Sequence, residues 1–270
     1  MRNSPNYSMK FSEDKNKLYI HFLKSPVLFS YLIGDLDDFY FPLCKWPVLE
    51  NEDGNIDDAI LIFNNPRFVC VQALGLTSDF PKLLQDTIQH LPDSFYCHYL
   101  TEYKDIFLEQ YEEKPLSSHW KMKLESYKKS HSETDDVKRL SMSDYDAVFD
   151  LYETAYPDRY FDERLLATGK FFGIFDGDKI IAIAGVHVYS KQYKIAVLGS
   201  ITTHPDYRGK GLATKVSSRI IEDLKNYVEL ITLNVQDDNL PAIRCYEKLG
   251  FVKHCEYEEA HFTRRGIKSD

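Results

Sequence analysis

The stretch Leu198–Leu224, which reads LGSITTHPDYRGKGLATKVSSRIIEDL, decides the fold of the second half of this 270-residue chain. It begins within an apolar run rich in β-formers, so we expect a strand over Ile195–Thr203. A turn is expected at His204-Pro205-Asp206-Tyr207. Apolar residues then recur at the spacing of one helix face, at Leu212, Val216, Ile220, Ile221 and Leu224.

A strand, a glycine-bearing loop and a helix start, in this order, make an anion-binding site. The first amides of a helix have no intrahelical partner and lie at the positive end of the helix dipole. Gly209 and Gly211 let the backbone curve around an oxyanion without a Cβ in the way. Arg208 and Lys210 add charge, and Thr214 adds a hydroxyl. The pattern predicts a pyrophosphate site, with a basic turn carrying ordinary capping glycines as the alternative. Neither the Walker loop nor the dinucleotide loop is completed here.

Two segments resemble one known family. Residues 208–213 fit the pattern Arg/Gln-x-x-Gly-x-Gly/Ala and resemble the coenzyme A loop of the GCN5-related N-acetyltransferases. The segment Asn239-x-x-Ala242-x-x-x-Tyr246-x-x-x-Gly250-Phe251 is similar to a second signature of that family. The expected order over residues 136–265 is strand, helix, helix, three strands, helix, strand, helix, two strands, as in the family. The resemblance implies an α/β fold with a mixed sheet, the acyl-CoA N-acyltransferase (GNAT) fold.

The resemblance also implies a cosubstrate, acetyl-CoA, and the groups that hold it. The loop amides from Gly209 to Thr214 are expected to bind its phosphates. The main chain of Ile201–Thr203 is expected to bond the pantetheine arm like an added strand. There the strand leaves its parallel neighbour, and an amide near Ile201 is placed to polarise the thioester carbonyl.

Two residues of the second signature receive roles by the same resemblance. Asn239 is expected to reach the pantetheine arm with its side-chain amide, the alternative being a helix cap alone. Tyr246 is expected to be the general acid that protonates the leaving thiolate, the alternative being an aromatic core residue. The predicted cofactor-binding residues are Ile201, Thr202, Thr203, Arg208, Gly209, Lys210, Gly211, Leu212, Ala213, Thr214, Asn239 and Tyr246, and the predicted catalytic residue is Tyr246.

The sequence leaves the general base open. Some family members carry a glutamate on the fourth strand, but Tyr193–Thr203 contains no carboxylate. His187, Tyr189 and His204 are the alternatives, each acting directly or through water. Asp158, between two expected helices, is the residue expected to attract an ammonium of the acceptor.

A polar stretch near residues 125–135 separates two expected domains, 1–130 and 131–270. The first contains a strand–helix–strand–helix–strand run that repeats the order of the second, but its loop has no arginine and one glycine. We interpret it as a degenerate acetyltransferase-like domain without cofactor, an unrelated α/β cap being the alternative. We also expect a helix over His21–Tyr40 and a closing antiparallel pair, Phe251–Tyr257 with Ala260–Arg264.

Composition narrows the class of protein. The formal net charge of −9 argues against nonspecific binding to nucleic acid or anionic membranes. No apolar run reaches the roughly 18 residues of a membrane span, and the first residues lack the apolar centre of a secretory signal. Five cysteines without C-x-x-C spacing predict reduced thiols and a cytoplasmic protein, and no metal site is expected.

The leading functional hypothesis is an acyl-CoA-dependent N-acetyltransferase acting on an amine of a small molecule, amino acid or peptide. A transferase for longer acyl groups or for a hydroxyl acceptor is one alternative. A noncatalytic acyl-CoA-binding sensor is another, which the missing strand-four carboxylate favours and the presence of Tyr246 disfavours. The acceptor is not readable from the sequence, and a homodimer is left open.

Overall fold

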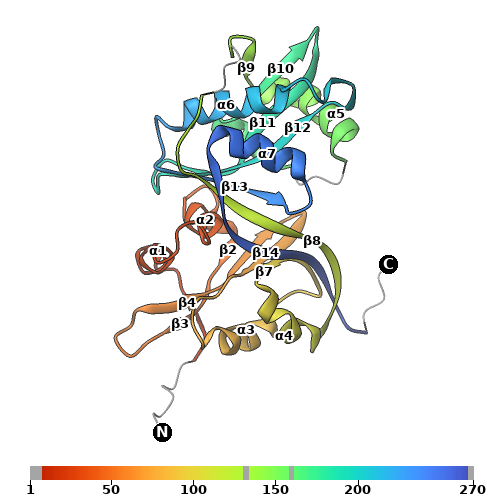
Figure 1. Cartoon of the computed structure of the whole chain (residues 1–270). Coiled ribbons are helices and arrows are strands. Elements are labelled where there is room, and N and C mark those ends of the chain that lie inside the picture. The colour runs from red at the N-terminus through yellow and green to blue at the C-terminus, as the bar shows by residue number, and fades with distance from the viewer. Residues whose placement is uncertain (1–7, 130–133, 158–160, 267–270) are drawn as a thin grey trace. The chain divides into compact units, whose positions relative to one another are not determined.

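The computed structural model describes residues 8–129, 134–157 and 161–266 (Figure 1). The chain forms two compact units, unit 1 with residues 1–120 and 255–270 and unit 2 with residues 121–254. The sequence-based boundary was a single one at 130/131. The structure changes unit after residue 120 and again after residue 254. Two long strands, β8 (Tyr111–Leu124) and β14 (Phe251–Arg264), have residues in both units.

The strands of unit 1 fall into two groups, a small antiparallel one and a larger mixed one. A small sheet has the order β1-β3-β4, and a larger one runs β2-β5-β6-β7-β14. The strands of unit 1 besides β8 and β14 are β1 (Lys10–Phe11), β2 (Cys44–Lys45), β3 (Pro47–Glu50), β4 (Ile56–Ala59), β5 (Leu61–Asn65), β6 (Phe68–Ala73) and β7 (Ser94–Tyr99). Its α-helices are α1 (Lys15–Phe22), α2 (Ser30–Gly34), α3 (Phe80–Ile88) and α4 (Lys104–Leu108), with 3-10 turns at Phe41–Leu43 and Thr101–Tyr103.

The order β6-α3-β7-α4-β8 confirms the predicted run of alternating strands and helices in unit 1. β5 and β6 pair as an antiparallel hairpin, and β6 pairs with β7 in parallel. The core beneath them is aromatic: the rings of Phe95, Phe107 and Phe262 stack with centroids 4.7–6.2 Å apart. Phe262 comes from β14, so the end of the chain completes the core of unit 1.

Two sequence-based expectations are wrong. The segment His21–Tyr40 is not one helix: it holds the last two residues of α1 and all of α2, and Pro26 between them removes an amide and restricts the residue before it. The predicted antiparallel pair at the C-terminus is a single strand, β14. Tyr257-Glu258-Glu259-Ala260 contains no turn-forming residue, so the strand runs on, and Glu258–Thr263 pairs with β7.

Unit 2 contains a mixed sheet in the order β13-β12-β11-β10-β9, in which only β12 and β13 pair in parallel. Its strands are β9 (Val137–Arg139), β10 (Phe172–Asp176), β11 (Lys179–Ser190), β12 (Ile195–Thr203) and β13 (Leu230–Gln236). Its helices are α5 (Tyr145–Ala155), α6 (Leu212–Leu224) and α7 (Leu240–Leu249), with 3-10 turns at Met142–Asp144, Glu163–Thr168 and Pro205–Tyr207.

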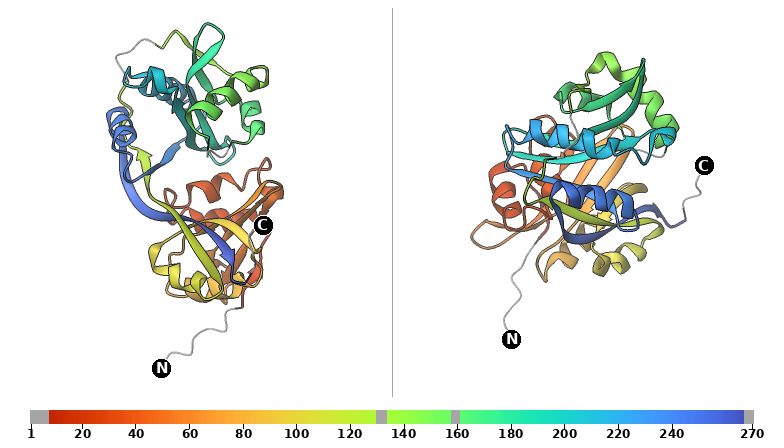
Figure 2. Two further views of the ribbon diagram at one scale, coloured as in Figure 1. Left: turned by 90° about the vertical axis from the view of Figure 1, so that its right-hand side faces the viewer. Right: turned by 45° about the horizontal axis from the view of Figure 1, so that its top comes forward.

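Helices α5 and α6 lie on opposite faces of this sheet (Figure 2). The apolar face that the sequence predicts for α6 is buried. The side chains of Val216, Ile220, Ile221 and Leu224 on it are all 0% exposed. Each such side chain contributes about 1.5–3 kcal/mol by burial. This packing fixes the axis of α6, and with it the position of the loop that precedes the helix.

Candidate functional site

The loop between β12 and α6 presents free backbone donors. Gly209 (φ 77°) and Gly211 (φ 76°) both adopt the left-handed conformation, and Gly211 is the N-cap of α6. No side chain caps this helix, and no acidic residue lies in its first turn. Among the residues that the structure describes, the amides of Gly209–Thr214 have no hydrogen-bond partner. A Cβ at either glycine would meet no atom within 4 Å, so the space beside the loop is open.

The side chains around this loop are partly used by the loop itself. Arg208 donates from Nε to the carbonyl of Thr203 (3.2 Å) and from Nη2 to that of Ala155 (3.4 Å). Its guanidinium therefore ties the loop to the ends of β12 and α5 while remaining exposed. The ammonium of Lys210 lies 4.7 Å from the ring centroid of Tyr207. Thr214 hydrogen-bonds through Oγ1 to Sγ of Cys245 (3.1 Å), which links α6 to α7.

β12 and β13 separate before the loop. Their parallel register ends at Leu198 opposite Leu233, so residues 199–203 of β12 and 234–236 of β13 do not pair with each other. Gly199 and Thr202 still pair with β11, but Ser200 and Ile201 between them have no partner in that register. This is a β-bulge, in which Ser200 has a φ of 54°. The hydroxyl of Tyr152 on α5 donates to the Ser200 carbonyl (2.9 Å) and holds the bulge in place.

The predicted pantetheine-binding segment, Ile201–Thr203, therefore lies where β12 no longer pairs with β13. The bulge turns the main chain at Ile201 out of both neighbouring ladders. The bulge was not predicted from the sequence, because nothing in a run of strand-forming residues indicates that Ser200 adopts a left-handed conformation.

Tyr246 lies on α7 and is 8% exposed. Burial raises the pKa of its phenol, with smaller contributions from Cys245 and Tyr156. The phenol is therefore protonated at neutral pH and available as a donor. Asn239 is the N-cap of α7, and its Oδ1 accepts from the Ala242 amide (3.2 Å). Asn239 thus caps α7, and its side-chain NH2 donates no hydrogen bond to any described residue.

The three candidate bases have different surroundings. The ring of His187, a bulged residue of β11, lies against Gly199, where a Cβ would come 1.8 Å from Cδ2 of the imidazole. His204 caps the 3-10 turn that follows β12: its Nδ1 accepts from the Asp206 amide (3.3 Å). The ring of Tyr189 lies 5.0 Å from the Lys170 ammonium. His187 and His204 both lie near the separated end of β12, His187 against Gly199 and His204 directly after Thr203. Asp158 lies outside the described residues.

Two polar side chains on β13 were not predicted as site residues. Thr232, which is 0% exposed, has an unpartnered Oγ1, and both the carbonyl oxygen and the NH2 of Asn234 are buried without a partner among the described residues. The two residues are separated by one position and share a face of β13. Unpaired buried groups of this kind each cost about 1–3 kcal/mol. The available sequence signal was the pair of polar residues in the apolar strand ELITLNV.

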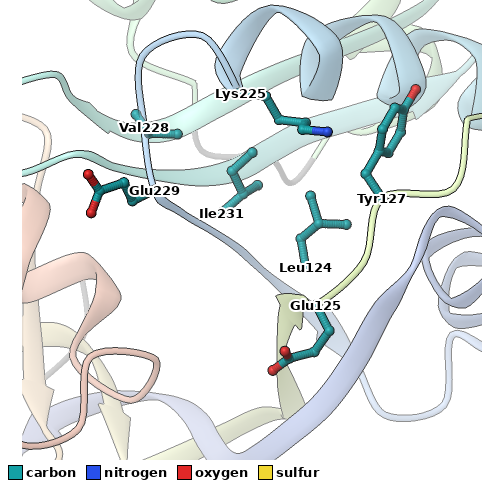
Figure 3. A pocket seen from close by; sticks show the side chains of 7 residues that line it. All are labelled: Leu124, Glu125, Tyr127, Lys225, Val228, Glu229 and Ile231. Atoms are coloured by element: carbon teal, nitrogen blue, oxygen red, sulfur yellow. The ribbon is translucent and has the colours of Figure 1, made fainter.

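A surface pocket of about 240 Å³ lies at the other end of α6 (Figure 3). Lys225 and Tyr127 extend toward one another there, with the ammonium 5.0 Å from the ring centroid. α6 has 13 residues and rises about 1.5 Å per residue, so roughly 20 Å separates this pocket from Gly211. The pocket is lined by Leu124, Glu125, Tyr127, Lys225, Val228, Glu229 and Ile231. It is not part of the loop site.

Other features of the described residues bear on the class of site. All five cysteines are free thiols. No group of three or more His, Cys, Asp or Glu residues in ranges 8–129, 134–157 and 161–266 is arranged to hold a metal ion. None of the helices in these ranges is long and apolar enough to cross a membrane.

Comparison with known proteins finds a family match over part of the chain. Residues 134–251 match the sequence model of the acetyltransferase (GNAT) family. A stretch of 96 residues is 31% identical to the uncharacterized N-acetyltransferase YobR of Bacillus subtilis (strain 168), and it spans 35% of this chain and 38% of that protein.

Solved structures are similar over both units. A GCN5-related N-acetyltransferase from Sphaerobacter thermophilus has a TM-score of 0.61 and 13% identity, over 97% of this chain and 98% of that chain. A tandem GNAT protein from the clavulanic acid biosynthesis pathway has a TM-score of 0.55 and 11% identity, over 97% of this chain and 100% of that chain. At these identities the two structures show the fold alone.

The chain is therefore a two-domain protein with the mixed α/β GNAT fold in tandem, as the sequence predicted. Residues 134–251, which lie in unit 2, match the GNAT family, whose general activity is acyl-CoA-dependent acetyl transfer.

Proposed function

We propose that this protein transfers an acetyl group from acetyl-CoA to an amine of a small molecule, an amino acid or a peptide. The observation that carries the proposal is the set of unpartnered amides at Gly209–Thr214, around two left-handed glycines at the start of α6. Such amides fit the phosphates of coenzyme A, since they supply converging donors and the positive end of the helix dipole. The open space beside both glycines supports the same fit.

The acyl-bearing arm is assigned to the gap that opens after Leu198 and Leu233. Main-chain groups of Ile201, Thr202 and Thr203 bind it there, and the free NH2 of Asn239 adds a donor. Coenzyme A supplies the activated thioester carbonyl. The Ile201 amide, freed by the bulge, is the donor that we assign to the charge developing on the carbonyl oxygen.

Proton movement requires an acid and a base. We assign the acid to Tyr246, because its phenol lies on α7 and carries at neutral pH a proton that it can donate to the leaving thiolate. We assign the base to His187, because its imidazole lies directly against Gly199, one residue before the bulge. β12 contains no carboxylate that could take this role.

We propose that the acceptor of the acetyl group contacts polar side chains of β13. The Thr232 hydroxyl and the Asn234 carboxamide offer both donors and acceptors without a net charge. They suit an acceptor that carries hydroxyl or amide groups beside its amine. We further propose a cytoplasmic location, which the five free cysteines support.

Calorimetry with acetyl-CoA and the release of free thiol in the presence of an amine panel test the function together. We expect binding and acceptor-dependent thiol release by the wild type. Tyr246→Phe should bind acetyl-CoA as the wild type does but turn over roughly 100-fold more slowly. Tyr227→Phe, at the exposed far end of α6, is the matched control and should be unchanged. Wild-type turnover by Tyr246→Phe at every pH would refute the acid assignment.

A noncatalytic acyl-CoA sensor is the second candidate, favoured by the absence of a carboxylate on β12. It predicts binding without thiol release for every amine, every hydroxyl acceptor and every acyl chain length tested. Release with a longer acyl-CoA or with an alcohol would instead identify the corresponding transferase.

A further inference from the structure

Unit 1 contains a second strand–loop–helix segment, β6, residues 74–79 and α3, in the same order as β12, its loop and α6. A carboxylate from elsewhere in unit 1 fills this loop. Asp58 on β4 is 0% exposed, and its Oδ1 accepts from the Leu76 amide (3.1 Å). Its Oδ2 accepts from the Thr77 amide (3.1 Å) and from the Thr77 hydroxyl.

Thr77 also binds two further amides, at the end of this loop and at the start of α3. Thr77 accepts from the Asp79 amide through Oγ1 (3.2 Å) and from the Phe80 amide through its carbonyl (3.2 Å). The space beside Gly75 is taken by the ring of Phe80, since a Cβ there would lie 1.9 Å from Cγ of that ring. β6 and β7 pair up to their last residues, Ala73 and Tyr99, so no gap opens between them.

The Asp58 carboxylate is held by neutral donors of the loop, on Leu76 and Thr77, which precede the N-cap of α3. Nε2 of His21 lies 4.0 Å from Oδ1, and burial lowers the pKa of His21 to about 4, so this imidazole is neutral at pH 7. Burial raises the pKa of Asp58, while its hydrogen bonds to Thr77 and Leu76 and the charge of Lys24 oppose the rise. The carboxylate is therefore enclosed, fully hydrogen-bonded and shielded from solvent.

We propose that the β6–α3 loop is an oxyanion site whose permanent occupant is the Asp58 carboxylate. Unit 1 consequently binds no coenzyme A, and the loop accepts a small exogenous carboxylate when its own is removed. Formate is the probe that matches the carboxylate lost in Asp58→Gly. The site lies wholly within unit 1 and is independent of acetyl transfer by unit 2.

The test is the thermal unfolding midpoint of the full chain in sodium formate and in sodium chloride at equal ionic strength. Asp58→Gly should unfold roughly 5 °C or more below the wild type, because three donors lose their partner. Formate at about 100 mM should recover a few degrees of this loss, by binding only the folded form, and chloride should not.

Asp57→Gly is the matched control, since it removes the neighbouring carboxylate, bonded to Asn51, from the same strand. It should show no difference between formate and chloride. Equal responses of the two variants to formate would overturn the proposal.

Asp58→Asn keeps the shape of the side chain but has one acceptor oxygen where two are needed, so it should also unfold below the wild type. This variant keeps the proposal testable if Asp58→Gly does not fold. A wild-type midpoint for Asp58→Asn would show that the loop needs no anion, and would refute the inference.

Discussion

The two strand–loop–helix segments of this protein share an element order and differ in what their backbone amides bind. In unit 2 the amides of Gly209–Thr214 have no partner among the described residues, and β12 leaves β13 five residues before its end. In unit 1 the amides of Leu76 and Thr77 are bonded to Asp58 and those of Asp79 and Phe80 to Thr77, and β6 stays paired with β7 to the end. The same topology thus gives one open and one closed loop.

The difference shows that a binding site of this kind is made by unsatisfied donors and not by the fold. A helix start with bare amides needs an anion. In our proposals Asp58 occupies the loop of unit 1, and coenzyme A occupies that of unit 2. A few side chains would then decide which of two loops with the same element order binds a ligand.

Gly211→Glu should have the largest effect on this comparison. It places a β-carbon in a left-handed conformation and a carboxylate beside the amides, which makes the unit 2 loop resemble that of unit 1. We expect the affinity for coenzyme A to fall by roughly 100-fold or more, since like charges in such a site cost several kcal/mol. Gly177→Glu, with a φ of 60° and equally open space, is the control and should bind normally in the same calorimetric titration.

Replacing one glycine of each loop by alanine tests the space beside it, which is filled at Gly75 and open at Gly209. Gly75→Ala should lower the free energy of unfolding by about 3 kcal/mol, because Phe80, whose ring centroid lies 4.6 Å from that of Tyr103, has no room to move. Gly209→Ala should lower the free energy of unfolding by about 1 kcal/mol, because the new Cβ meets no atom and the only penalty is the positive φ. Urea denaturation of both variants measures this difference, and equal losses would contradict the contrast.

The neutral imidazole beside Asp58 gives the stability of unit 1 a pH dependence. Because burial lowers the pKa of His21 from 6.5 to about 4, the unfolded chain binds more protons between these values. Stability from this group is therefore complete above pH 6.5 and is lost as the pH falls to 4.

The comparison variant is His21→Gln, which does not titrate. The excess stability of the wild type over this variant should shrink by about 2–3 kcal/mol between pH 7 and pH 4. Lys24, Asp57 and Asp58 face His21 in both proteins, so their own titration largely cancels. An excess that is independent of pH would show that folding does not lower the pKa of His21.

Lys210→Ala should have the smallest effect. The ammonium is exposed and lies over Tyr207, so its contribution to phosphate binding is a screened surface interaction. We expect the dissociation constant for coenzyme A to rise about fivefold at low salt and less at high salt. Lys179→Ala, at the start of β11, is the control and should leave the constant unchanged. A loss that does not depend on salt would assign Lys210 a structural role.

The sequence was sufficient for features that depend on local pattern. The strand, the two glycines and the helix face from Leu212 to Leu224 were all predicted, as was the element order of unit 1. Features set by distant partners were not. Asp58 reaches a loop 18 residues later in the chain, and β14 continues into unit 1 because β7 offers it a free edge. The Ser200 bulge depends on Tyr152, 48 residues away.

Calorimetric titration of the intact wild-type chain with coenzyme A tests the central claim most directly. We expect one molecule bound per chain in the wild type, and an affinity at least roughly 100-fold lower in Gly211→Glu. Two molecules per chain, or a Gly211→Glu variant that binds as the wild type does, would contradict it.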